Sequence, residues 1–166
     1  MVAQNVAFGV IAAVMAVAAV RLVTVQNVVR AALYLVIVLA GAAAQFILLA
    51  AEFVAAVQVL VYIGAIVVLF LFGIMLTRAP IGRHFQLDND QRWVAALVSL
   101  FLLGLLAAVL GDAFGKQKID VDGLQASGAT QALGDSIFSA YLVPFEVVSV
   151  LLLAALVGAI VLARKD

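Results

Sequence analysis

Long apolar stretches alternate with short polar segments along the whole chain. Four of these stretches carry no charged residue and are about as long as a membrane-spanning helix, namely 2–20, 31–51, 53–77 and 93–111. A fifth stretch, 137–163, carries a single charge at Glu146. A helix needs about 20 apolar residues to cross a hydrocarbon layer of ~30 Å. The pattern therefore predicts an all-α integral membrane protein with five transmembrane helices.

Glu52 is the only charged residue between the second and third stretches. A single helix over 31–77 would reach roughly 70 Å at ~1.5 Å per residue, which is more than twice the thickness of the membrane. The chain is therefore expected to fold back near Glu52 in a tight hairpin. The whole chain, 1–166, is expected to form one membrane domain, with a polar loop at 112–135 outside the membrane.

Charged residues between the stretches predict the orientation of the helices. One side of the membrane would carry seven basic residues, namely Arg21, Arg30, Arg78, Arg83, Arg92, Arg164 and Lys165. The other side would carry only Lys116 and Lys118, among the acidic residues Asp112, Asp120, Asp122 and Asp135. The positive-inside rule then predicts an outside N-terminus and a cytoplasmic C-terminus. Trp93 and Tyr141 are expected as interfacial anchors at opposite faces.

Composition excludes several kinds of site. The chain is 68% hydrophobic and 11% charged, it contains no Cys, and its single His is His84. Iron–sulfur ligation, thiolate chemistry and a histidine metal cluster are therefore excluded within this chain. The balance of nine basic and nine acidic residues gives no sign of nucleic-acid binding. We expect no catalytic residue, no metal site and no cofactor bound by this chain.

Two acidic residues are candidates for a proton path, and each has a structural alternative. Glu52 could relay protons near the outer face, or it could be a turn residue stabilised by the N-terminal dipole of the next helix. If the last helix begins at Pro144, Glu146 lies in its first turn, where a negative charge is favourable. If that helix begins near Ser136, Glu146 lies inside the apolar layer as a buried ionisable group. Tyr62 is the third candidate for this path.

The stretch 53–77 contains polar and flexible residues near the predicted middle of the membrane. Tyr62 and Gly64 lie about 14–17 Å from its start at ~1.5 Å per residue. A phenol at that depth needs a hydrogen-bond partner, and a Gly either admits a bulge or allows close packing of a neighbouring helix. The small residues 40–44 in the second stretch also favour close packing between helices.

Two segments resemble a known family. Residues 51–76 read AEFVAAVQVLVYIGAIVVLFLFGIML, and residues 141–164 read YLVPFEVVSVLLLAALVGAIVLAR. Both closely resemble the J subunit of bacterial NADH-quinone oxidoreductase (respiratory complex I), the counterpart of mitochondrial NADH dehydrogenase subunit 6. The segment 112–134 has no motif of that family.

The resemblance implies a switchable third helix. In the family this helix carries a π-bulge, which would lie here at Tyr62, Ile63 and Gly64. Loss of the bulge rotates the following side chains by about 100°. The resemblance thereby implies that Phe70 and Phe72 gate a water path, so that quinone reduction is coupled to proton pumping.

The resemblance also implies a place in a larger enzyme. The chain would be a non-catalytic membrane subunit of a proton-translocating NADH:quinone oxidoreductase in the cell inner (plasma) membrane, packed against H-, K-, A- and N-type subunits and lipid, near the quinone. The complex as a whole would use FMN, iron–sulfur clusters, NADH and a quinone. Two alternatives stay open: the same subunit in a complex fed by ferredoxin or another donor, and a structural scaffold with no moving part.

Overall fold

The computed structural model describes residues 2–76, 91–116 and 130–164. In these ranges every element is a helix, and five helices are long and apolar enough to cross a membrane, which confirms the expected fold class. The five spans are α1 (Val2–Thr24), α2 (Val28–Leu48), a third span made of α3 (Glu52–Val57), η1 (Gln58–Val67) and α4 (Val68–Leu76), then α5 (Arg92–Phe114) and α8 (Leu142–Ala163). A short helix, α7 (Thr130–Phe138), precedes α8.

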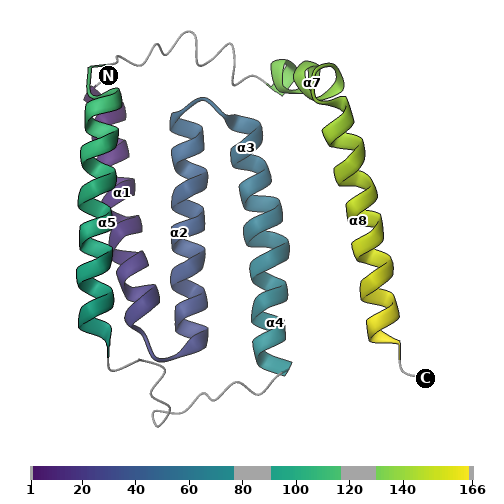
Figure 1. The fold of residues 1–166 in the computed structure, drawn as a ribbon, viewed down its shortest axis with the longest axis horizontal. Coiled ribbons are helices and arrows are strands. Elements are labelled where there is room, and N and C mark those ends of the chain that lie inside the picture. Colours follow the sequence, from purple (N-terminus) through teal and green to yellow (C-terminus); the bar gives the residue numbers. More distant parts are fainter. Residues whose placement is uncertain (1, 77–90, 117–129, 165–166) are drawn as a thin grey trace.

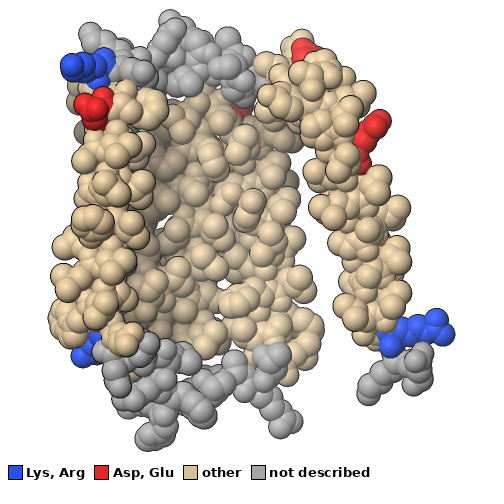
Figure 2. All heavy atoms as spheres, in the orientation of Figure 1, with Lys and Arg blue, Asp and Glu red and all other residues tan. Residues whose placement is uncertain are grey.

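The spans run up and down across one layer of membrane thickness, and the two chain ends lie at opposite faces (Figure 1). The described arginines flank the lower ends of the helices, namely Arg21, Arg30, Arg92 and Arg164. The described acidic residues are all near the upper ends, and they are Glu52, Asp112, Asp135 and Glu146 (Figure 2). By the positive-inside rule the arginine end faces the cytoplasm.

The start of α2 is fixed by a side-chain cap. The Oδ1 atom of Asn27 accepts a hydrogen bond of 3.1 Å from the backbone N–H of Arg30. Asn is among the preferred N-cap residues because it satisfies one of the helix's unpaired N–H donors. The helix therefore begins at Val28 and ends at Leu48, three residues earlier at each end than the range 31–51 expected from charge alone.

The expected hairpin near Glu52 is a three-residue turn closed by a Schellman motif. The N–H of Ala51 donates to the carbonyl of Phe46 at 2.9 Å, and the N–H of Ala50 donates to the carbonyl of Ile47 at 3.0 Å. Ala50 has a φ of 58°, the left-handed conformation that this motif requires and that Gly usually supplies. The turn thus ends α2 and starts α3 within three residues. This is the tight connection expected because one helix over 31–77 would be too long for the membrane.

The contacts between helices centre on α2. It packs against α1 on one side and against the third span on the other. The buried apolar residues are small or medium-sized, namely Ala18, Ala32, Ala43, Ala55 and Val67. At Gly41 an added Cβ would overlap the Met15 side chain of α1, with Sδ at 2.7 Å, so the absence of a side chain there allows Met15 to reach α2. The small residues 40–44 thus serve close helix packing.

The helices α5 and α8 have almost no partner within the described chain. Every described residue of both helices is exposed, and neither contributes to the buried core. Figure 2 shows open space between α8 and the third span over most of their length. Their apolar side chains are therefore available to lipid or to helices of other proteins.

The expected helix 137–163 is wrong as one continuous element. The structure breaks it at residues 139–141, between α7 and α8. Pro144 has no N–H to pair with the carbonyl of residue 140, and its ring would clash with that residue if the helix continued through it. The break is bridged by a hydrogen bond of 3.1 Å from Tyr141 N–H to the Ser136 carbonyl and by an edge-on ring contact of 5.4 Å between Phe138 and Phe145.

Parts of the expected loops lie outside the described residues. These are 77–90, which includes Arg78, Arg83 and His84, and 117–129, which includes Lys118, Asp120 and Asp122. The expected polar loop 112–135 overlaps helices at both ends, because α5 extends to Phe114 and α7 begins at Thr130.

Ala50 provides a test of the hairpin. A left-handed conformation costs an L-residue roughly 1–2 kcal/mol that Gly does not incur. Ala50→Gly should therefore raise the thermal midpoint of the purified membrane assembly that contains this chain, by a stabilisation of about 1 kcal/mol. Ala50→Val should lower the midpoint, because a β-branched residue is strongly disfavoured at positive φ. A lower midpoint for the Gly variant would contradict this account of the turn.

The small core predicts that the chain is unstable without partner proteins. When expressed alone in membranes it should be degraded or should aggregate, because α5 and α8 have no protein surface to pack against. Size-exclusion chromatography in mild detergent measures this directly. A monodisperse chain that persists for days would refute the prediction.

Candidate functional site

The third span changes its helical geometry in the middle. Residues Glu52–Val57 are α-helical, residues Gln58–Val67 form a π-helix, and α-helix resumes at Val68. The expected bulge residues Tyr62, Ile63 and Gly64 all lie inside the π segment. The π-bulge expected in this helix is therefore confirmed.

Burial along the third span shows what the π segment does to packing. One row of less exposed side chains runs through Ala55, Gln58, Ile63, Val67 and Leu71. Beside this row Val57, Gly73 and Ile74 are half-buried, and the other residues of the span are exposed. The spacing between successive members is three, five, four and four residues. An α-helix repeats its face every three or four residues, whereas a π turn spans five. The five-residue step from Gln58 to Ile63 is therefore where one extra residue is accommodated.

A regular α-helix would present a different set of residues to α2. Without the extra residue, each position after Gln58 would be occupied by the residue one place earlier in the sequence. Tyr62 would take the place of Ile63, and Phe70 would take the place of Leu71. This corresponds to a rotation of about 100° for everything that follows. The π segment thus determines whether aromatic or aliphatic side chains face α2.

Gly64 lies on an open face of the π segment. A Cβ added there would meet only the backbone oxygen of Val59, at 3.4 Å, among the described residues. The close neighbouring helix that the sequence suggested for Gly64 is therefore absent from the described part of this chain.

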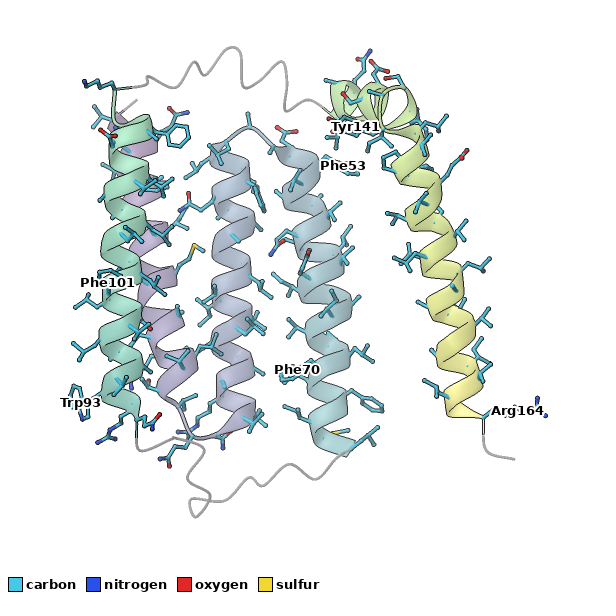
Figure 3. All side chains as sticks on the ribbon, in the orientation of Figure 1. Phe53, Phe70, Trp93, Phe101, Tyr141 and Arg164 are labelled. Carbon is cyan, nitrogen blue, oxygen red and sulfur yellow. The ribbon has the colours of Figure 1, made fainter. Side chains whose placement is uncertain are left out.

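The aromatic candidates are all exposed within the described chain. Tyr62 is 47% exposed, Phe70 is 45% exposed and Phe72 is 52% exposed. Phe70 is on α4, in the half of the span nearer the arginine end (Figure 3). Tyr62 is about 15 Å from the start of α3 at ~1.5 Å per residue, close to the middle of a ~30 Å hydrocarbon layer. In this π form the rings of Tyr62, Phe70 and Phe72 are available to partner helices rather than packed within the described chain.

Glu52 is the first residue of α3 and is exposed. The residue before it, Ala51, caps α3 without any side-chain hydrogen bond. A carboxylate in the first turn interacts favourably with the unpaired N–H groups and the positive end of the helix dipole. The location fits the structural alternative for Glu52, at the end of the span away from the described arginines.

Glu146 lies just beyond the first turn of α8. The helix begins at Leu142, so Pro144 is its third residue and its missing N–H falls among donors that have no partner within the helix. Glu146 is the fifth residue, about 6 Å into the helix at ~1.5 Å per residue. This is close to the first of the two helix starts considered above, and the side chain is exposed.

The described structure does not bring the three proton-path candidates together. Glu52 and Tyr62 belong to one span, whereas Glu146 belongs to α8, whose main contacts are with α7. Phe53 and Tyr141 lie on either side of the space between α3 and α8 (Figure 3). No group of three His, Cys, Asp or Glu residues suited to a metal ion occurs in the described ranges.

Sequence reasoning missed Gln58. It is 9% exposed and is the buried polar residue of the described chain, at the first position of the π segment. A Gln in a stretch that is otherwise apolar over many residues was the available signal. Its meaning depends on which way the side chain faces, and the sequence does not give that.

Comparisons with known proteins agree with this architecture. A family model described as NADH-ubiquinone/plastoquinone oxidoreductase chain 6 matches residues 18–162. The F(420)H(2) dehydrogenase subunit J of Methanosarcina mazei is 41% identical, over 98% of this chain and 92% of the relative. The NAD(P)H-quinone oxidoreductase chain 6 of Synechocystis is 39% identical, over 98% of this chain and 82% of the relative. The subunit 6 of Paulinella chromatophora is 38% identical, over 98% and 79% respectively.

The charge distribution predicts that Glu52 and Glu146 face the outer side. Because the chain contains no Cys, single Cys substitutions at these positions introduce the only thiols in this subunit. A membrane-impermeant maleimide added from outside should label both, and the same reagent added from the cytoplasmic side should label neither. Arg164→Cys is the matched control and should show the reverse. Labelling of positions 52 and 146 from the cytoplasmic side alone would overturn the orientation.

Proposed function

The chain belongs to the NADH-ubiquinone/plastoquinone oxidoreductase chain 6 family, and from this premise we propose that it couples quinone reduction to proton pumping through the register of its third span. It is a membrane subunit of an oxidoreductase complex of the complex I type. The described residues include no group of three His, Cys, Asp or Glu that could hold a metal ion. The contribution proposed for this subunit is a conformational one.

The observation that carries this proposal is the five-residue step between Gln58 and Ile63. Because of this step, the row of less exposed side chains continues along the whole span. The regular α-helical hydrogen bonds are replaced by π-helical ones over Gln58–Val67. A π turn is less favourable than an α turn and tends to occur at functional sites. Two helical forms of similar free energy make a two-state element, which a ligand or partner that prefers one form can shift.

The residues that change environment between the two forms are suited to controlling water. In the π form Tyr62 and Phe70 face outwards, and in the regular form they replace Ile63 and Leu71 next to α2. Apolar rings exclude water from a narrow passage, whereas a phenol can hydrogen-bond to it. We assign Phe70 and Phe72 to gating. Glu52, Tyr62 and Glu146 supply proton-exchanging or hydrogen-bonding groups, with partner subunits bridging the space between α3 and α8.

The electron donor binds to other subunits. One relative is named for F(420)H(2) and others for NAD(P)H, at nearly equal identity to this chain. The proposed role in coupling does not depend on which molecule donates the electrons. In this proposal the helical register of the third span responds to the reduction of the quinone. NADH is the donor we propose, and ferredoxin or another donor is the alternative.

The redox groups of such a complex also belong to other subunits. This chain has no Cys for iron–sulfur ligation, so the clusters are assigned to other subunits. We assign FMN to those subunits as well, with the quinone nearby. We propose that H-, K-, A- and N-type membrane subunits cover the exposed faces of α5, α8 and the third span. We place the assembly in the inner (plasma) membrane.

Deletion of Leu60 tests the switch without disturbing packing. Removing one residue between Gln58 and Ile63 shortens their separation to four, so a regular α-helix presents the same face to α2. The complex should assemble, yet proton uptake per quinone reduced should fall roughly tenfold or more. The reason is that the shortened span is held in the regular form and can no longer change between the two forms. Leu60→Ala, at the same exposed position, is the control and should behave like wild type.

Gly64→Leu is a second variant with the same expected direction. Its side chain would press against a partner helix, and overpacking typically costs 1–3 kcal/mol. Tyr62→Phe should have a smaller effect because the ring is kept. Quinone reduction and proton uptake are measured in vesicles, and assembly is measured on a native gel. Normal pumping by an assembled complex that lacks Leu60 would leave this subunit as a static scaffold.

A further inference from the structure

Gln58 combines two properties that no other described residue shares. It is the buried polar residue of the described chain, with 9% of its surface exposed, and it is the first residue of the π segment. In hydrocarbon an amide side chain hydrogen-bonds to a neighbouring helix wherever it can, because lipid offers no alternative partner. The coincidence of burial, polarity and position indicates a role in placing the bulge.

The π segment packs against α2, and the hairpin sets the depth at which residues meet. Ala43 is six residues before Leu49, the C-cap of α2, and Gln58 is six residues after Glu52, the first residue of α3. The two positions therefore lie at matching depth, and Ala43 is 4% exposed. Gln58 is therefore level with the small-residue run 40–44 of α2.

We propose that Gln58 is a positioning residue that anchors the third span to α2 at the point where the π segment begins, so that any change of register is confined to the residues after it. The proposal rests on the switching function proposed above. It adds the fixed point about which that switch operates.

The burial pattern on each side of Gln58 supports a fixed point there. Ala55 and Gln58 are three residues apart, as in a regular helix, and Ala55 is 4% exposed. The irregular five-residue step comes immediately after Gln58. If the anchor holds, Glu52 stays at the outer hairpin in both forms, while Tyr62 and Phe70 change their neighbours. The anchor thereby separates a static outer part of the span from a mobile inner part.

Electron cryomicroscopy of the assembled complex tests the anchor. In wild type, particles should divide into bulged and regular forms, and the bulge should start at Gln58 in every bulged particle. In Gln58→Leu the bulge should start earlier, within residues 52–57, or the ratio of the two forms should change by roughly three- to tenfold, the worth of one hydrogen bond between membrane helices. Leu60→Ala removes an exposed side chain from the same segment and should change neither.

Further variants distinguish anchoring from plain packing. Gln58→Met keeps the length of the side chain without the amide, and it replaces Gln58→Leu if that complex does not assemble. Gln58→Glu keeps the length and a hydrogen-bonding end, and it should restore the wild-type start of the bulge. A bulge that still starts at residue 58 in Gln58→Met, with an unchanged ratio of forms, would overturn the proposal.

Proton uptake per quinone reduced, measured on the same samples, separates this inference from the proposed function. A displaced bulge with normal coupling would sustain the anchor and refute the switching role. A bulge that is not displaced, together with lost coupling after deletion of Leu60, would refute the anchor and sustain the switch.

Discussion

The close approach of α2 to its two neighbours organises the rest of the molecule. Four of the five buried apolar residues of the described chain are Ala, and the missing side chain at Gly41 makes room for Met15 of α1, so the helices approach one another closely through small residues. Such a contact tolerates little change in register. A single extra residue in the third span must therefore be absorbed as a π turn if the face towards α2 is to be preserved.

The limited packing of α2 against its two neighbours also fits a chain that is stable as part of an assembly. Lipid tails are as apolar as the side chains they meet, so burial of apolar surface gives little drive for helices to associate in a membrane. Because every described residue of α5 and α8 is exposed, most of the surface of these two helices makes no contact with the rest of the described chain. This surface is available to lipid or to helices of other subunits.

The switch and the redox chemistry are physically separate in this scheme. The third span contains no group that can accept an electron, and its polar residues are few and widely spaced. In the switch proposed above, the span changes between two hydrogen-bonding patterns that present different side chains to α2. This division suits a subunit whose relatives serve enzymes named for different electron donors.

The sequence alone determined the number of spans, the hairpin at Glu52 and the segregation of arginines, because length and charge decide these directly. The resemblance of 51–76 to a known family located the π segment. Only the tertiary structure decided which side of the third span meets α2, that Gln58 is buried and that Gly64 faces outwards. A helix that is apolar on all sides carries no periodic signal of its buried face, so its orientation depends on contacts with other helices. The sequence left the start of the last helix open between Pro144 and Ser136, and only the structure showed a break at residues 139–141, shortly before the proline that removes a backbone donor.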